Sequence, residues 1–190
     1  MSVYLYEESI VDELRKITGD DRIHIISPDQ SISFFAQLKD DKVKYPAVVM
    51  SRSSIRLGEY KNQVQRLKGQ TAKIDDDNYI VKAQLVDMRI EWNIDIYAVD
   101  RYSCDEIFRE LVFYIITHPR FSVKVPYNLD IDQNFDLFVM DDVVDNTDLN
   151  EFKNRGEYFR MTFTIYTENA HLFSSHKQYQ VVGKPVVDTK

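Results

Sequence analysis

Apolar residues near the start of the chain recur at steps of three and four. The stripe runs from Val3 to Ile17 and lies opposite a face rich in acidic and basic residues. This spacing places the apolar side chains on one side of an α-helix. Gly19 follows, and glycine is favoured where a helix ends in a left-handed residue. The pattern predicts an N-terminal helix from Val3 to Thr18.

Three short extended segments are predicted next, at residues 22–27, 31–38 and 47–51. Pro28 and Pro46 lie at the edges of these segments, where a missing backbone N–H disrupts a sheet least.

Strict alternation of apolar and polar residues marks the stretch that follows. Met88, Ile90, Trp92, Ile94, Ile96 and Ala98 share one side of a strand, and the residues between them are polar or Tyr. A strand with one buried and one polar face is typical of an antiparallel sheet. The phase reverses at Leu85-Val86, which predicts a bulge there or a change of partner strand.

A second helix is predicted before Pro119. Ser103 and Glu106 have the spacing of a capping box, and the helix is expected to end near Thr117. Its apolar residues cover more than one stripe, so we expect one side to face the chain's own sheet and another a partner, such as a neighbouring subunit. The candidate interface residues are Phe108, Val112, Ile115 and Ile116.

Further strands are predicted at 121–125, 135–145 and 157–167, and the residues from Ala170 onward are polar. We therefore predict an α+β fold in a single domain, residues 1–170, followed by an extended C-terminal arm, residues 171–190. The domain is expected to be a mainly antiparallel sheet with the N-terminal helix and the second helix packed on one face.

Composition adds limits on the class of protein. The 190 residues are 44% hydrophobic and include 12 Tyr and 11 Phe, enough for one sizeable core. A net charge of −7 disfavours a general nucleic-acid binder but leaves room for a local basic patch. The single Cys104 excludes an internal disulfide. The first residues do not resemble a signal peptide, and no stretch is apolar enough to cross a membrane, so we expect a soluble intracellular protein.

No catalytic or cofactor motif occurs. The four His residues are scattered, at positions 24, 118, 171 and 176, and the five Gly residues stand alone, so neither a metal-ligand spacing nor a phosphate-binding loop is present. Cys104 and His118 lie 14 positions apart on one predicted helix, about 20 Å at a rise of ~1.5 Å per residue. We therefore expect no cofactor and no enzymatic activity.

Acidic residues are concentrated in one region without any basic residue among them: Asp130, Asp132, Asp136, Asp141, Asp142, Asp145, Asp148 and Glu151. An exposed acidic surface is the simplest interpretation. A divalent-metal site, as in a hydrolase, would need several of these oxygens to converge. A third interpretation is an inter-subunit surface, for which the candidates are Asp136, Asp141, Asp142 and Asp145.

A basic stretch lies elsewhere, with Glu59 as its only acid: Arg52, Arg56, Lys61, Arg66, Lys68 and Lys73. It is either a solvated loop, an edge that contacts DNA phosphates, or a surface complementary to the acidic region of the next copy in a ring.

The order of elements resembles the tail terminator (tail completion) proteins of long-tailed bacteriophages. The resemblance rests on Tyr45-Pro46-Ala47-Val48-Val49, on the strand Ile90 to Ala98, and on the helix Ile107 to Ile116 with His118-Pro119 after it. It covers about Val3 to Thr167. The stretch from Ser51 to Lys73 and the C-terminal arm do not map onto the family.

The resemblance implies a hexameric ring, in the neck of the virion, that caps the tail tube and docks to the head–tail connector. It implies partners in further copies of the chain, in the tail tube protein and, if the tail contracts, in the sheath protein, with DNA passing through the lumen and no membrane. Assembly would take place in the host cytoplasm. The rival interpretations are another head–tail connector or baseplate structural protein, a divalent-metal hydrolase, and an inhibitor that binds a host protein.

Overall fold

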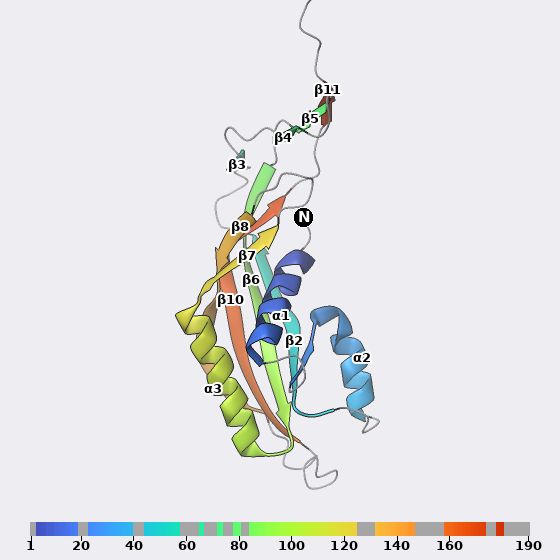
Figure 1. Ribbon diagram of the computed structural model, residues 1–190, viewed down its shortest axis with the longest axis vertical. Helices are drawn as coiled ribbons and strands as arrows, with labels where there is room; N and C mark the ends of the chain where they lie inside the picture. Colours follow the sequence, from blue (N-terminus) through green and yellow to red (C-terminus); the bar gives the residue numbers. More distant parts are fainter. Residues whose placement is uncertain are drawn as a thin grey trace, which may run out of the picture.

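The computed structural model describes residues 3–18, 23–39, 44–57, 65–66, 72–73, 78–80, 84–124, 132–146, 158–173 and 178–180. Within these residues the chain is an α+β domain, with three helices packed on a mixed and mostly antiparallel sheet (Figure 1). This confirms the fold class that the sequence predicts. None of the described helices combines the length and the hydropathy needed to cross a membrane.

The helices are α1 (Tyr4–Thr18), α2 (Pro28–Lys39) and α3 (Arg101–Thr117). The strands are β1 (His24–Ile26), β2 (Ala47–Leu57), β3 (Gln65–Arg66), β4 (Ala72–Lys73), β5 (Asn78–Ile80), β6 (Gln84–Ala98), β7 (Arg120–Lys124), β8 (Asp132–Asp136), β9 (Phe138–Asp145), β10 (Phe159–Phe173) and β11 (Gln178–Gln180).

The main sheet has the order β1-β2-β6-β10-β9, with β3 paired to β6 beyond the end of β2. Only the β1–β2 pair is parallel within it. β7 and β8 form a separate antiparallel hairpin, and β4, β5 and β11 form a small third sheet. The predicted strand at 135–145 is therefore two strands of different sheets, because buried Leu137 separates β8 from β9.

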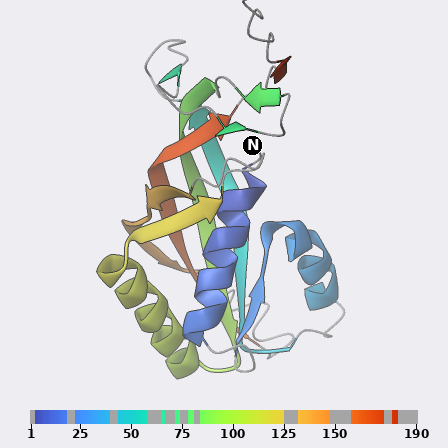
Figure 2. The same ribbon diagram turned by 45° about the horizontal axis from the view of Figure 1, so that its top comes forward.

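The main core lies between the sheet and two helices, α1 and α3. The six apolar residues of β6 that alternate from Met88 to Ala98 are all buried in it, together with Ile10 and Leu14 of α1 and Leu111 of α3. Figure 2 shows both helices on the same side of the long strands. The prediction of an N-terminal helix and a second helix on one face of the sheet is confirmed.

The third helix, α2, corrects the sequence prediction of an extended segment at 31–38. It lies on the opposite side of the sheet, where Phe34 packs against Tyr97 with ring centroids 5.4 Å apart. Pro28 occupies the first helical turn, a position that tolerates proline because its N–H has no intrahelical partner. Buried Ser31 and Phe34, three residues apart, have a helical period that the prediction overlooked.

Two boundaries also differ from the prediction. α3 begins at Arg101, because Asp100 is its N-cap and accepts a hydrogen bond from the Ser103 backbone N–H at 2.8 Å. The capping box predicted at Ser103 and Glu106 is therefore wrong. β10 continues to Phe173 and buries Ala170, whereas the prediction ended the strand at Thr167. Most of the predicted C-terminal arm lies outside the described residues.

The phase reversal predicted at Leu85-Val86 corresponds to a change of partner strand. β2 pairs with β6 as far as the Leu57–Met88 pair, and β3 takes over at the Gln65–Leu85 pair. On its other side β6 stays paired with β10 without a shift from Met88 to Leu85.

Candidate assembly surfaces

Arg52, the first of the predicted basic residues, is bound within its own chain. Its Nε and a terminal nitrogen donate to the two carboxylate oxygens of Glu7 at 2.7 and 2.9 Å, and Trp92 Nε1 donates to the same carboxylate at 3.1 Å. Glu7 is buried on α1. The two bonds from Arg52 therefore fix the helix to β2, and the bond from Trp92 fixes it to β6. The charge of Arg52 is therefore balanced within its own chain.

Arg56 lies farther along β2 and is exposed, with one of its nitrogens 3.9 Å from Glu91 Oε1. Glu91 also accepts a hydrogen bond from the Ser54 hydroxyl at 2.8 Å and from Arg89 Nε at 2.9 Å. The Ser54 hydrogen bond, helped by the two arginines, lowers the pKa of Glu91 from its usual value. Arg89 in turn contacts Glu168 and stacks over the Tyr166 ring.

The polar face of β6 is thus partly buried, and Glu91 and Asp95 are its buried acids. Asp95 is buried there and accepts hydrogen bonds from Arg160 at 3.0 and 3.2 Å and from the Thr162 hydroxyl. Arg160 also lies over the ring of Tyr97. Burial of these acids is tolerated because each carboxylate is paired with an arginine and further hydrogen bonded.

The other four predicted basic residues follow Arg56 along the chain. Arg66 and Lys73 lie in β3 and β4, at positions where only the backbone is described, and Lys61 and Lys68 lie outside the described residues.

The four candidate acidic residues are dispersed rather than convergent. Asp136 lies in β8 near Arg120, at 3.4 Å, and Asp145 ends β9 near Arg101 of α3, also at 3.4 Å. Asp141 and Asp142 lie exposed on β9. Among the described residues, no group of three or more His, Cys, Asp and Glu side chains is arranged to hold a metal ion.

The candidate interface helix α3 exposes different residues from those predicted. Ile115 is 1% exposed, and Phe108 packs edge-on against Phe163. Together with Val112, these two residues face the core of their own chain. Of the four predicted residues, Ile116 points outward with 64% of its surface exposed. The prediction that Phe108, Val112 and Ile115 form an interface is therefore wrong. The sequence shows two apolar stripes on this helix but does not reveal which of them meets the sheet.

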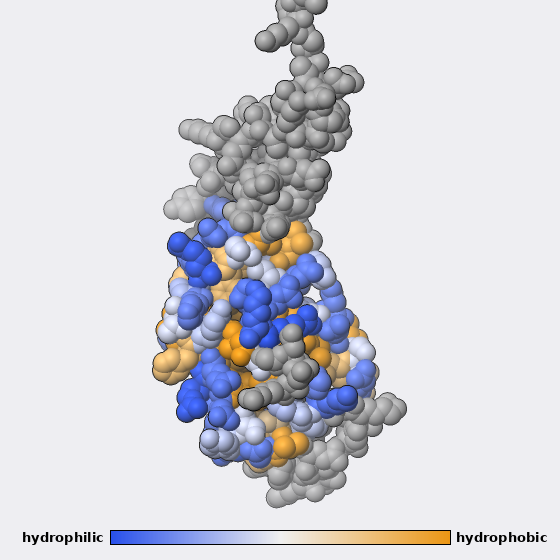
Figure 3. Space-filling model, viewed as in Figure 1, coloured by the Kyte–Doolittle hydropathy of each residue, from blue (hydrophilic) through white to orange (hydrophobic). Residues whose placement is uncertain are grey.

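The outward stripe of α3 consists of Tyr102, Phe113 and Ile116, with Arg109 between them. Steps of seven, four and three residues place these side chains on one face of the helix. The β9 strand lies next to α3 and exposes Val143 and Val144, at 44% and 49%. Apolar atoms reach the surface over the flank that α3 forms in Figure 3. Sequence reasoning missed these residues of the flank, apart from Ile116.

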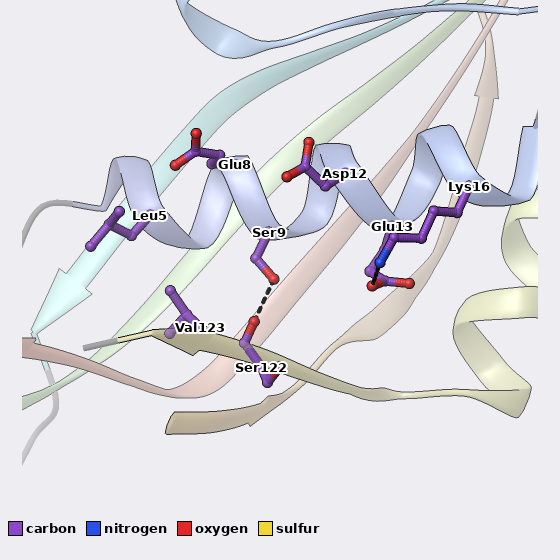
Figure 4. Close-up of a pocket in the computed structure, with 8 residues that line it drawn as sticks. All are labelled: Leu5, Glu8, Ser9, Asp12, Glu13, Lys16, Ser122 and Val123. Carbon is purple, nitrogen blue, oxygen red and sulfur yellow. Dashed lines mark hydrogen bonds and ion pairs between the residues drawn. The ribbon is translucent and has the colours of Figure 1, made fainter. Parts of the chain in front are cut away.

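A shallow depression of about 410 Å³ lies between α1 and β7 (Figure 4). Its walls are Leu5, Glu8, Ser9, Asp12, Glu13, Lys16, Ser122 and Val123. The Ser9 hydroxyl donates to the Ser122 carbonyl at 2.7 Å and so joins the helix to the hairpin, whereas Lys16 pairs with Glu13 within α1.

Cys104 and the described histidines do not form a reactive group. Cys104 is buried with its Sγ 3.6 Å from the Ile96 carbonyl, and burial raises the pKa of its thiol to about 11. His118 stacks on Tyr114 at the end of α3, and His171 pairs with Asp87 at 2.8 Å.

No family model and no curated protein matches this chain. The class of protein is therefore defined by the fold and its surfaces: an α+β domain with a paired ionic interior and an apolar flank on α3 and β9.

Proposed function

We propose that this chain is a structural subunit that assembles with copies of itself. More particularly, we propose that it is a tail terminator of a long-tailed bacteriophage, forming a ring that caps the tail tube and docks to the head–tail connector. Its place would then be the neck of the virion, after assembly in the host cytoplasm.

One observation carries the proposal: exposed apolar side chains of two neighbouring elements, α3 and β9, lie at one flank of the domain. Scattered apolar residues are ordinary on any protein surface, whereas a cluster from two neighbouring elements is typical of a contact with another protein. Tyr102, Phe113 and Ile116 contribute from α3, and Val143 and Val144 contribute from β9.

The arrangement of the flanks supports a ring. α3 and β9 lie at one side of the main sheet, while β1 lies at its other edge and α2 packs against that side (Figure 1). A subunit with different surfaces at its two flanks can contact its neighbours head to tail, and such contacts close into a ring when the rotation between copies permits. The resemblance in the order of elements supplies the particular assignment.

Mass photometry of the purified protein, alone and with tail tube protein, tests the proposal. A hexamer, or a ring formed on the end of tail tubes in electron micrographs, is the expected result. Monomers under both conditions would contradict the proposal. A stable ring elsewhere in the neck or in the baseplate would keep the structural class and replace the terminator assignment.

A further inference from the structure

Two strands of the main sheet have open edges, and they lie on opposite sides. β9 is the last strand in the order and pairs only with β10 among the described strands. β2 contacts β1 only through Ala47–Val49, so from Met50 to Leu57 its outer edge has no partner among the described strands. Such edges present free backbone N–H and C=O groups to which a strand of another chain can add.

Both open edges carry exposed apolar side chains. Val143 lies opposite buried Phe163 and Val144 opposite Thr162, so the two valines project from different faces of β9. Ile55 and Leu57 are the exposed apolar residues of β2. Edge strands that remain free in solution are usually protected by charged residues or proline. Both edges also carry charged residues, and the exposed valines, isoleucine and leucine beside these charges offer apolar area for a second chain to cover.

The charges at the two edges are opposite. β9 carries exposed Asp141 and Asp142, and residues 132–146 contain no Lys or Arg. The open part of β2 contains no acidic residue, and its exposed Arg56 is 3.9 Å from its nearest carboxylate, Glu91. Pairing β9 with a second β9 would gather six aspartates, three from each strand, whereas pairing β9 with β2 would bring opposite charges together.

Strand direction allows the second arrangement. β2, β6, β10 and β9 are each antiparallel to their neighbour, so β9 runs opposite to β2. Rotating a second copy about an axis parallel to the strands brings its β2 antiparallel beside β9. The alternation of strand directions then continues from one subunit into the next.

We infer that the acidic edge of β9 pairs with the open edge of β2, residues 50–57, in a second copy of this chain, so that one sheet runs through the assembly. The inference rests on the proposed self-assembly and names the surfaces that perform it. Because two different edges meet, the contact is heterologous and leaves one edge of each kind free for the next copy.

Charge reversal tests the contact. Asp141→Lys with Asp142→Lys reverses the β9 edge, and Arg56→Glu reverses the β2 edge. Each variant alone is expected to weaken self-association at least about tenfold, because like charges would meet at the contact. An equimolar mixture of the two variants is expected to recover most of the lost self-association, because opposite charges then meet at every contact. Analytical ultracentrifugation measures both effects.

A matched control reverses two exposed acids elsewhere. Glu8→Lys with Asp12→Lys on α1 changes the net charge by the same amount as the β9 variant and is expected to leave association unchanged. Equal weakening by this control, or no recovery in the mixture while circular dichroism shows folded variants, would overturn the inference.

Crosslinking gives an independent result. The natural Cys104 is buried, so cysteines introduced by Ile55→Cys and Phe138→Cys are the reactive ones. These two positions lie at nearly the same height along the strands, because Phe138 pairs with Tyr166, Tyr166 with Glu91, and Glu91 with Ser54. With a short bis-maleimide, the double variant is expected to give a ladder of crosslinked oligomers, the mixed single variants only dimers, and each single variant only monomers. Dimers from Phe138→Cys alone would show β9–β9 pairing and overturn the inference. If wild-type oligomers form but these edges do not crosslink, only the inference fails, whereas monomeric wild-type protein contradicts the proposed function as well.

Discussion

Glu7 supplies the polar part of the contact between α1 and the sheet. Its buried carboxylate accepts two hydrogen bonds from Arg52 and one from Trp92. The sequence shows Glu7 as one of several charged residues on a helix, and Arg52 as part of a basic stretch. Their pairing spans 45 positions, and no local pattern reveals it.

Glu7→Ala is expected to destabilise the domain by about 2–4 kcal/mol, because it leaves the Arg52 guanidinium and the buried Trp92 N–H without their acceptor. The partial exposure of Arg52 keeps the loss below that of a fully buried pair. Urea unfolding followed by Trp92 fluorescence measures the change. Glu8→Ala, at an exposed position of the same helix, serves as the control, and equal midpoints for the two variants would contradict this role of Glu7.

Glu91 gives the domain a defined dependence on pH. Its pKa is lowered in the folded state by the Ser54 hydroxyl and by Arg89 and Arg56, so ionised Glu91 stabilises the fold above the unfolded pKa of about 4.3. This contribution is lost as the pH falls through the lower, folded pKa. Glu91→Gln is therefore expected to be less stable than wild type at neutral pH and to show a shallower loss of stability below about pH 5.

Urea midpoints measured across the acid range test this expectation for Glu91. Glu106→Gln, on the exposed side of α3, removes one carboxylate without the buried hydrogen bonds and serves as the control. Parallel pH profiles for wild type and Glu91→Gln would contradict it.

At the scale of elements, the long amphipathic segments and the short strands β1 and β7 were predicted correctly, whereas α2 was not. The N-terminal helix and the alternation along β6 follow from period alone, since each buries a complete stripe. α2 was not predicted because its buried residues are few and because Pro28 was interpreted as a strand boundary. The start of α3 was misplaced by one turn because Asp100 and Ser103 are both good caps, and only the geometry shows that the Asp100 carboxylate accepts the hydrogen bond.

Substitutions in α2 test which of its residues hold this helix against the sheet. Phe34 is 5% exposed and packs on Tyr97, whereas Ile32, two positions earlier, is 81% exposed. Phe34→Ala is expected to lower the free energy of unfolding by about 3–4 kcal/mol, and Ile32→Ala by less than about 0.5 kcal/mol. Similar losses for both in urea unfolding would show that α2 packs differently.

At the scale of the molecule, charge is divided between interior and surface in a way that composition does not show. The buried acids of α1 and β6 are paired with arginines, while the acids of β9 stay exposed. The sequence groups basic residues in one stretch and acidic residues in another, but the described members of each group do not share one environment. Their members differ in role because long-range pairing removes some charges from the surface, as with Arg52, and leaves others exposed, as with Arg56.

Substitutions at the two neighbouring isoleucines of α3 are expected to affect stability and assembly separately. Ile115 faces the core and Ile116 faces outward beside Phe113, so a serine at each position has a different effect. Ile115→Ser is expected to lower the free energy of unfolding by about 3 kcal/mol, because it buries a hydroxyl in place of an apolar group. Ile116→Ser with Phe113→Ser is expected to leave stability within about 0.5 kcal/mol of wild type and to reduce self-association or binding to tail tubes several-fold. Urea unfolding together with mass photometry distinguishes the two effects. If removing the outward residues leaves every association unchanged, the apolar flank of α3 takes no part in the proposed assembly, and only the sheet edges remain as its contact surfaces.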